Sequence, residues 1–270
     1  MVTKKIKSLH FPKPPEKIND FFKSRNWKPF SFQKKTWKAY RDGKSGLVHA
    51  PTGTGKTYAV WTPPLLDWME ANQAGRKARP KLQVLWLTPL RALVEDTTRS
   101  LCELVDELEI PWTVESRTGD TSGSIKAKQR RSFPSALVTT PESLSLLLSY
   151  PETKECFSEL QAVVVDEWHE LLSTKRGSQT ELCLARLRKW NPNLRTWGLS
   201  ATLGNLEEAM AALIGNQKNG VLIDGDIQKK FVVKTIIPKN MECFPWAGHL
   251  GGKLLEQVAQ AIEKKSTSLV

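Results

Sequence analysis

Residues 50–57 combine the side chains and the backbone freedom that are needed to bind a chain of phosphates. This stretch reads APTGTGKT and follows a short apolar run. Its two glycines allow a tight turn whose N–H groups point inward, while Lys56 can reach the β- and γ-phosphates and the Thr57 hydroxyl can ligate Mg²⁺. A helix that begins near Lys56 would add its positive N-terminal end to the site. The candidate phosphate ligands are Thr52, Gly53, Thr54, Gly55, Lys56 and Thr57.

A second candidate group, Asp166, Glu167 and His169, follows the β-branched apolar run at 162–165. Ligands of open α/β sheets bind at the carboxyl ends of the strands. There Asp166 can hold Mg²⁺, mostly through water, and Glu167 can polarise the attacking water as a general base. The spacing of His169 after the acids favours a sensor of the γ-phosphate.

Both motifs have simpler interpretations. Ala50 stands where the strict phosphate-loop pattern has glycine, so residues 50–57 could be a glycine-rich surface turn. Adjacent acids after a strand could do no more than cap a helix and meet its dipole. The presence of both motifs in one chain favours hydrolysis of a bound triphosphate over either alternative.

Alternating strand and helix patterns surround these motifs. Apolar runs predict strands at 46–49, 82–87, 112–114, 136–139, 162–165, 194–199 and 220–223, and helical patterns occur at 15–23, 33–40, 56–72, 91–108, 141–148, 181–190 and 206–213. This βαβ rhythm predicts an α/β fold, with a mainly parallel sheet and helices on both faces. A strand covered on both faces should be uniformly apolar, as 162–165 is.

Composition divides the chain into four segments. Residues 1–32 form a basic, aromatic N-terminal collar, 33–224 the nucleotide-binding domain, 225–248 an interdomain crossing with a strand-like run at 231–237, and 249–270 the start of a second domain. The last residues stop as a new apolar run begins. We therefore expect the chain to be part of a longer polypeptide.

The charge balance favours a polyanionic partner. The net charge is +12 and the isoelectric point is near 9.5, which suits neutralisation of nucleic-acid phosphates, although each basic cluster could also be solvated surface. Four scattered cysteines indicate reduced intracellular thiols, and there is no apolar signal core or membrane-length run. We expect a cytoplasmic protein.

Taken together, the motifs resemble the first RecA-like domain of a superfamily 2 helicase of the DExH type. Residues 50–57 match motif I, 166–169 match motif II and 200–202 match motif III, while 88–93, 118–120 and 139–144 resemble motif Ia, the Thr-Gly element and motif Ib. They occur in family order across residues 25–225. The stretch 27–33 resembles the Q motif.

The resemblance implies ATP and Mg²⁺ as cofactors and assigns roles to individual residues. Lys56, Asp166, Glu167 and His169 would be catalytic, Thr57 and Asp166 would hold the metal, Gln33 would read the adenine edge, and Ser200 and Thr202 would couple nucleotide state to the strand site. A single nucleic-acid strand would contact Pro89, Arg91, Thr118, Gly119, Thr140 and Glu142. Trp27 and Phe11 are candidates for the aromatic that stacks on the base, or else pack the collar.

The string DEWHELLSTKRG at 166–177 is most similar to the Lhr-like group, in particular its bacterial ligase-associated DNA repair helicases. That similarity implies ATP-dependent 3′-to-5′ translocation on single-stranded DNA, nucleoid-associated activity, and repair proteins such as a ligase or nuclease as partners. An RNA helicase of the DEAD-box type is an alternative. The presence of His169 in place of the second Asp of the DEAD motif argues against it. A non-catalytic nucleic-acid adaptor is another, against which the complete set Lys56, Thr57, Asp166 and Glu167 argues.

Helicases of this family use a second RecA-like domain, whose arginines stabilise charge on the transferred phosphate. None of the motifs of that domain lies within these 270 residues. We therefore expect the chain to bind ATP·Mg²⁺ weakly, to hydrolyse it poorly and not to unwind a duplex by itself.

Overall fold

The computed structural model describes residues 16–72, 79–215, 220–225, 233–236 and 255–264. The chain divides into two compact units, Met1–Ile227 and Gln228–Val270. In the second unit, the described residues include helix α11 (Leu255–Glu263), and residues 233–236 are neither helix nor strand, contrary to the strand predicted there. The part of the predicted collar before residue 16, and most of the predicted segments 225–248 and 249–270, lie outside the described residues.

A seven-stranded sheet organises the first unit. Its order is β3-β4-β2-β5-β6-β1-β7, and every neighbouring pair is parallel. The strands are β1 (Ser45–His49), β2 (Val84–Leu87), β3 (Val114–Arg117), β4 (Ala136–Thr139), β5 (Ala162–Val165), β6 (Arg195–Ser200) and β7 (Gly220–Asp224). The predicted α/β fold is confirmed, and the sheet is parallel throughout.

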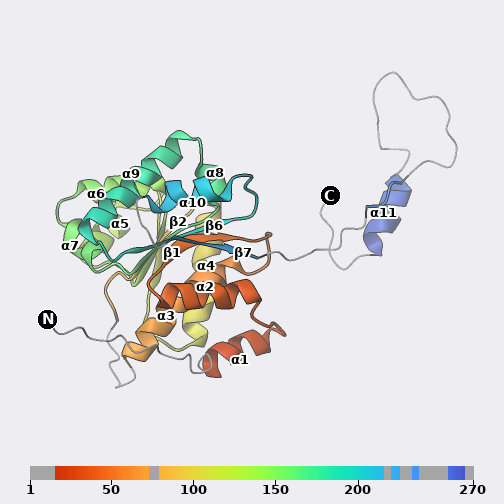
Figure 1. Cartoon of the computed structure of the whole chain (residues 1–270), viewed down its shortest axis with the longest axis horizontal. Coiled ribbons are helices and arrows are strands. Elements are labelled where there is room, and N and C mark those ends of the chain that lie inside the picture. Colours follow the sequence, from red (N-terminus) through yellow and green to blue (C-terminus); the bar gives the residue numbers. More distant parts are fainter. Residues whose placement is uncertain (1–15, 73–78, 216–219, 226–232, 237–254, 265–270) are drawn as a thin grey trace. The chain divides into compact units, whose positions relative to one another are not determined.

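Helices cover both faces of this sheet (Figure 1). One face carries α1 (Glu16–Ser24), α2 (Ser31–Arg41), α3 (Lys56–Ala71) and α4 (Arg91–Glu107), and the opposite face carries α6 (Pro141–Ser149), α7 (Thr153–Ser158), α8 (Trp168–Leu171), α9 (Lys175–Trp190) and α10 (Leu206–Ile214). Helix α5 (Gly123–Arg131) lies beside the edge strand β3, to which Gln129 is hydrogen-bonded. Among the described helices, none is both long enough and apolar enough to cross a membrane.

Two apolar cores lie under the two helical layers, and strands β1, β2, β4 and β5 contribute to both. In β5, Ala162 and Val164 pack with α1–α4, whereas Val163 and Val165 pack with the helices of the other face. Because both faces of the strand are covered, its sequence is apolar without alternation. The two cores hold the strand ends in fixed positions.

Strand β3 and helix α5 differ from the sequence prediction, whereas helix α3 agrees with the helix predicted at 56–72. Strand β3 begins at Val114 rather than at 112, because Trp112 packs edge-on against Trp61 and Trp68 instead of joining the ladder. Helix α5 was not predicted, because it is strongly polar and its sequence has no amphipathic pattern. Ser122 caps its start. Helix α3 continues through two prolines that are buried in the core, where packing outweighs their low helix propensity.

Candidate functional site

Nearly all of the predicted site residues lie at the end of a strand or directly after it. Residues 50–57 follow β1, 166–169 follow β5 and 200–202 stand at the end of β6; 88–91 follow β2, 118–120 follow β3 and 140–142 follow β4. Since all strands are parallel, these residues meet at one edge of the sheet, its carboxyl edge. The strand order puts the nucleotide candidates along β5-β6-β1 and the nucleic-acid candidates along β3-β4-β2.

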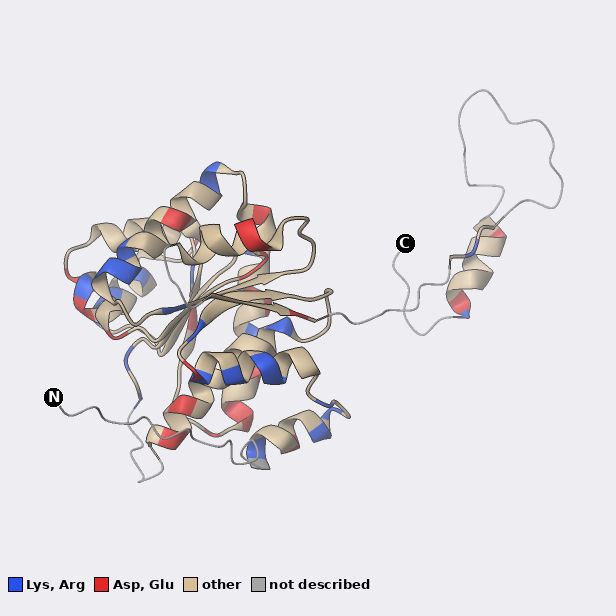
Figure 2. Cartoon of the chain, in the orientation of Figure 1, with Lys and Arg blue, Asp and Glu red and all other residues tan. Residues whose placement is uncertain are grey.

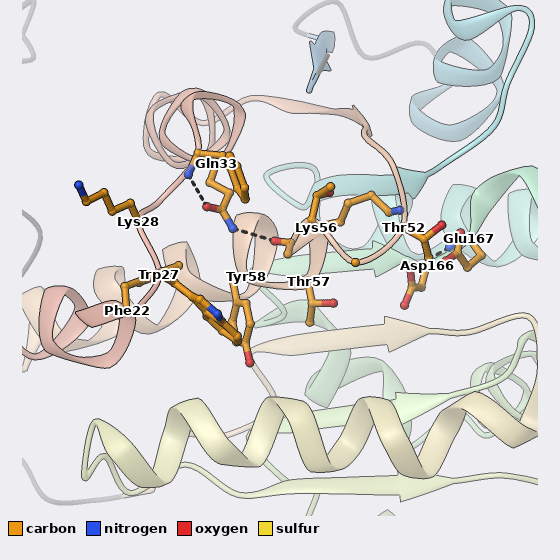
Figure 3. Close-up of a pocket in the computed structure, with 14 residues that line it drawn as sticks. Phe22, Trp27, Lys28, Gln33, Thr52, Lys56, Thr57, Tyr58, Asp166 and Glu167 are labelled. Atoms are coloured by element: carbon orange, nitrogen blue, oxygen red, sulfur yellow. Dashed lines mark hydrogen bonds between the residues drawn. The ribbon is translucent and has the colours of Figure 1, made fainter. Parts of the chain in front are cut away.

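A cavity of about 490 Å³, here called the nucleotide cavity, lies beside the carboxyl ends of β5 and β1. It is lined by Phe22, Trp27, Lys28, Phe30, Gln33, Thr52, Gly53, Thr54, Gly55, Lys56, Thr57, Tyr58, Asp166 and Glu167. Figure 3 shows the two acids on one side of the loop and the rings of Trp27 and Tyr58 on the other. The fold therefore brings the loop, Gln33 and two of the three residues after β5 into one space, with His169 just outside its lining.

The loop between β1 and α3 is held in shape by its own contacts. Gly53 and Gly55 take φ values of +75° and +81°, the left-handed region that favours glycine. The Thr54 hydroxyl donates to the Pro51 carbonyl at 2.6 Å, and the buried Lys56 Nζ donates to the Ala50 carbonyl at 2.9 Å. Helix α3 begins at Lys56, so its positive end faces the cavity.

Gln33 joins helix α2 to this loop. Its Oε1 accepts from the Phe30 N–H at 2.8 Å, and its Nε2 donates to the Gly55 carbonyl at 2.9 Å. The side chain is 2% exposed, and a Cβ at position 55 would lie only 2.8 Å from Nε2. The amide retains one hydrogen and one lone pair for a ligand, and its two existing bonds fix its position beside the loop.

Asp166 is a partly buried carboxylate directly after β5. Its Oδ1 accepts from the Glu167 N–H at 2.9 Å, and its Oδ2 accepts from the Trp86 indole at 3.4 Å. Burial, followed by the neighbouring Glu167 charge, raises the pKa of Asp166 to about 6, against the opposing effects of these hydrogen bonds and of Lys56. A cation beside this carboxylate would offset the cost of its buried charge.

Glu167 carries both backbone strain and an unused acceptor. Its φ is +42°, which is uncommon for a residue with a side chain, and its Oε2 is buried without a hydrogen bond, although it lies 3.5 Å from His169 Nδ1. Such strain occurs frequently at functional sites. The free oxygen is available to accept a proton or a hydrogen bond from a water molecule in the cavity.

The two predicted coupling residues differ in their contacts. Ser200 Oγ lies 3.2 Å from His169 Nδ1, and His169 Nε2 lies 3.3 Å from Glu170 Oε1. Thr202 is exposed, and no hydrogen bond joins it to the described residues 166–169. Of the pair, Ser200 alone links the end of β6 to the group after β5.

The chemistry of these groups fits a hydrated Mg²⁺ ion beside a triphosphate. Mg²⁺ keeps several waters and takes phosphate oxygens together with one or two protein oxygens. Thr57 and Asp166 both line the nucleotide cavity and supply oxygens of this kind. Within the described part of the chain, no three His, Cys, Asp or Glu residues cluster to form an all-protein metal site.

The opposite end of the cavity is aromatic. Trp27 is 47% exposed, and its ring centroid lies 6.0 Å from that of Tyr58. Trp27 thus remains a candidate for stacking on a base, while Phe11 lies outside the described residues. The sequence analysis missed Tyr58, Phe22 and Lys28 as lining residues, because an isolated aromatic or basic residue in one sequence carries no signal that separates lining from packing.

A smaller hollow of about 140 Å³, here called the strand hollow, lies at the ends of β3 and β4. It is lined by Arg91, Arg117, Thr118, Gly119, Lys126, Thr140, Glu142, Ser143 and Leu146. Five of the six predicted nucleic-acid residues meet here. The sixth, Pro89, is buried and does not contribute to the lining.

Charged side chains around the strand hollow are already partly paired. Arg91 Nη1 lies 3.1 and 3.2 Å from the two carboxylate oxygens of Asp120, and Lys126 Nζ donates to the Gly119 carbonyl at 2.7 Å. Glu142 accepts two hydrogen bonds from Arg176. Burial raises the pKa of Glu142, but Arg176, the Glu142 backbone N–H and Thr140 outweigh that effect and lower it overall.

Basic side chains continue from the hollow along α5. Figure 2 shows the Lys and Arg residues of this helix beside the edge of the sheet. Arg91, Arg117 and Lys126 line the hollow against the single acid Glu142. This surface is therefore suited to a polyanion.

Comparison with known proteins agrees with this arrangement. A protein-family model described as DEAD/DEAH box helicase matches residues 30–209. The ATP-dependent helicase Lhr-Core of Methanocaldococcus jannaschii is 31% identical over 264 residues, covering 94% of this chain and 31% of that protein. The Lhr helicase/uracil glycosylase of Escherichia coli is 30% identical, over 84% of this chain and 16% of that protein.

A solved structure shows the same fold. The helicase Lhr of Mycobacterium smegmatis, bound to single-stranded DNA and AMP-PNP, superposes with a TM-score of 0.68 and 28% identity, over 92% of this chain and 32% of that one. The chain thus spans less than a third of the length of these relatives. With a parallel RecA-like sheet and a family model that covers two thirds of its length, the chain belongs to the DEAD/DEAH box helicase family.

Proposed function

We propose that this chain is the ATP-binding half of a helicase motor that hydrolyses ATP in response to single-stranded DNA. The observation that carries the proposal is the convergence of Lys56, Asp166 and Glu167 on one cavity from two different strand ends. A structural turn and a helix cap, the simpler interpretations of the two motifs, would not need to meet. Family membership supports the same assignment.

Each residue has a role that follows from its surroundings. Lys56, held by the Ala50 carbonyl, neutralises phosphate charge without having to be ordered first. Asp166 and Thr57 would hold Mg²⁺, which when bound neutralises and bridges phosphate oxygens. Glu167 Oε2, which makes no hydrogen bond and lies 3.5 Å from His169 Nδ1, would orient and deprotonate the attacking water.

The proposed motor is completed by a second RecA-like domain. The family mechanism uses arginines from that domain to stabilise the transferred phosphate, an effect of about three to five orders of magnitude in related NTPases. On this proposal the chain alone binds ATP·Mg²⁺ but turns it over slowly.

We further propose single-stranded DNA as the track and DNA repair as the setting, with a repair ligase or nuclease as partner, 3′-to-5′ movement and activity at the bacterial nucleoid. The net charge of +12 supports a nucleic-acid partner. Similarity to an Lhr structure that contains single-stranded DNA supports DNA over RNA. Comparing ATPase stimulation by single-stranded DNA and by RNA of the same length distinguishes the two.

Two variants test the ATPase assignment. Lys56→Ala should weaken binding of a fluorescent ATP analogue by at least about tenfold, because a buried charge contact to the phosphates is lost. Glu167→Gln should bind the analogue as the unmodified chain does and, in a protein with both RecA-like domains, lose turnover. Equal turnover by the Glu167→Gln variant would remove Glu167 as the base, and unchanged binding by Lys56→Ala would contradict the phosphate site.

A further inference from the structure

Arg117, the last residue of β3, has an unusual environment for an arginine. Its side chain is 2% exposed, yet it lines the strand hollow beside Thr118 and Gly119. Arginine stays protonated in proteins, so this is a permanently charged group inside the fold. It is not one of the positions to which the motif comparison assigns a nucleic-acid contact.

The hydrogen-bond partners of Arg117 are neutral. Its Nη1 donates to the Lys126 carbonyl at 3.0 Å and lies 3.4 Å from Gln129 Oε1. The amide of Gln129 is fixed in this orientation because its Nε2 donates to Glu115 Oε2 and to the Ser116 carbonyl, both at 3.0 Å. No carboxylate of the described residues lies within 4 Å of the Arg117 guanidinium.

The neighbouring groups increase the positive charge rather than balance it. Burial, together with Arg130, lowers the pKa of Arg117. Arg91 and Lys126 line the same hollow, and Thr140 caps α6 there, so the positive end of a nine-residue helix also faces it. The single acid in the lining, Glu142, is already bound by Arg176.

A buried charge without a counter-ion is costly, and structures retain one where a ligand supplies the missing charge. The ligand that fits is small, anionic and rich in acceptor oxygens, because the guanidinium offers a planar set of donors. The strand hollow has a volume of about 140 Å³, and five of the predicted nucleic-acid contact residues line it. A phosphodiester group satisfies each of these conditions.

We propose that Arg117 is a phosphate-binding residue, whose guanidinium forms the counter-charge for one phosphodiester of a single strand seated in the strand hollow, with Gln129 as the positioning residue. This inference rests on the proposed function, since it requires a strand at this edge of the sheet. It adds a buried charged contact from the end of β3 to the contacts suggested by the motifs.

The experiment compares two substitutions that each remove one positive charge. Arg117→Gln removes the buried guanidinium, while Arg186→Gln removes an exposed one on α9 that packs over the Trp190 ring and does not line the strand hollow. Binding of a fluorescent oligothymidylate to the 270-residue chain is measured by anisotropy across a range of salt concentrations. Binding of an ATP analogue reports that each variant is folded.

Arg117→Gln should weaken DNA binding by about tenfold at low salt and reduce the slope of log affinity against log salt by about 0.7, the value for one phosphate of a single strand. Arg186→Gln should change both quantities much less, and neither variant should change nucleotide affinity. Equal effects of the two substitutions would overturn the proposal. Failure of the unmodified chain to bind DNA would overturn the proposed strand function and this inference together.

A second measurement keeps the test decisive if Arg117→Gln does not fold. Oligonucleotides with one uncharged methylphosphonate linkage, moved stepwise along the strand and held in one register by a 3′ or 5′ duplex block, are bound to the unmodified chain and to Arg117→Lys. One linkage should weaken binding of the unmodified chain, and the Lys variant should retain that sensitivity because it retains the charge. Uniform insensitivity to every linkage would contradict a buried phosphate contact.

Discussion

At the scale of single residues, Asp166 shows how this site trades stability for binding. The carboxylate is partly buried and accepts hydrogen bonds from the Glu167 N–H and the Trp86 indole, but these do not offset its desolvation. A pKa that rises from 3.8 to about 6 on folding corresponds to roughly 3 kcal/mol of lost stability at neutral pH. A bound cation would recover part of that free energy.

This imbalance predicts a pH-dependent gain from Asp166→Asn in the absence of ligand. The folded pKa lies above the unfolded value, so the penalty is absent below about pH 4 and complete above about pH 6. Thermal unfolding of the nucleotide-free chain should therefore show a higher Tm for the variant at neutral pH, with a difference that disappears toward pH 4. The exposed substitution Asp96→Asn serves as the control, and an Asp166→Asn variant no more stable than the unmodified chain at neutral pH contradicts the argument.

Sequence patterns predicted the residues of the nucleotide cavity better than those of the strand hollow. Lys56, Thr57 and Asp166 belong to short motifs whose chemistry depends on neighbouring positions, so one sequence suffices to find them. The bond between Gln33 and the Gly55 carbonyl joins positions 22 residues apart, and only the fold shows it. Arg117 escaped prediction because a basic residue is normally exposed, and burial is a property of the three-dimensional structure.

At the scale of elements, the turn between β1 and α3 depends on helix α2. Gly55 leaves no room for a Cβ because Gln33 Nε2 occupies that space, and its φ of +81° is unfavourable for other residues. The turn at Gly43 has a similar φ of +74° but nothing within 4 Å of a Cβ. Comparing substitutions at the two glycines therefore separates the effect of backbone strain from the effect of a clash with Gln33.

Substituting each glycine by alanine uses this difference. Both Gly55→Ala and Gly43→Ala should lose roughly 1 to 2 kcal/mol of stability from the left-handed backbone. Only Gly55→Ala should also weaken binding of an ATP analogue, by about tenfold or more, because the Gln33 amide and the loop must shift. Denaturant unfolding and analogue titration measure the two effects, and similar losses of nucleotide affinity in both variants would show that contact with Gln33 is unimportant.

The order of the elements was predictable, and their limits were less so. Strand β5 was found because a strand covered on both faces has a continuous apolar sequence. Helix α5 was missed because its mean hydropathy is low and its contacts to β3 come from Gln129 and from backbone groups. The start of β3 was misplaced because the apolar Trp112 serves the core between α3 and α4 instead of the ladder.

At the scale of the whole RecA-like unit, the nucleotide cavity and the strand hollow occupy neighbouring halves of one edge. At β6, Ser200 Oγ contacts His169 Nδ1; both residues belong to the nucleotide half, and we propose that this contact relays nucleotide state toward the strand hollow. Coupling of two sites is reciprocal, so the factor by which single-stranded DNA changes ATP affinity must equal the factor by which ATP changes DNA affinity. Typical factors are about 5 to 150.

Ser200→Ala should reduce this coupling factor toward one while each ligand alone binds as before, because the variant removes a link and no ligand contact. Thr202→Ala, in the same motif but exposed and without a bond to residues 166–169, is the matched comparison and should retain the coupling. Titrations of an ATP analogue with and without DNA, and the reverse, give both factors. Equal loss of coupling in the two variants would show that the bond to His169 does not carry it.

The uniform direction of the strands also determines where the protein can be altered safely. The turns that enter β1 and β6, at 42–44 and 191–193, lie on the rim opposite the two sites, and their tips are exposed. A dye, a tether to a surface or an inserted peptide attached at Pro192 or Lys44 would therefore stand a full strand length away from both ligands. Because all strands run in the same direction, single molecules could be immobilised through one rim while the sites on the opposite rim stay accessible to their ligands.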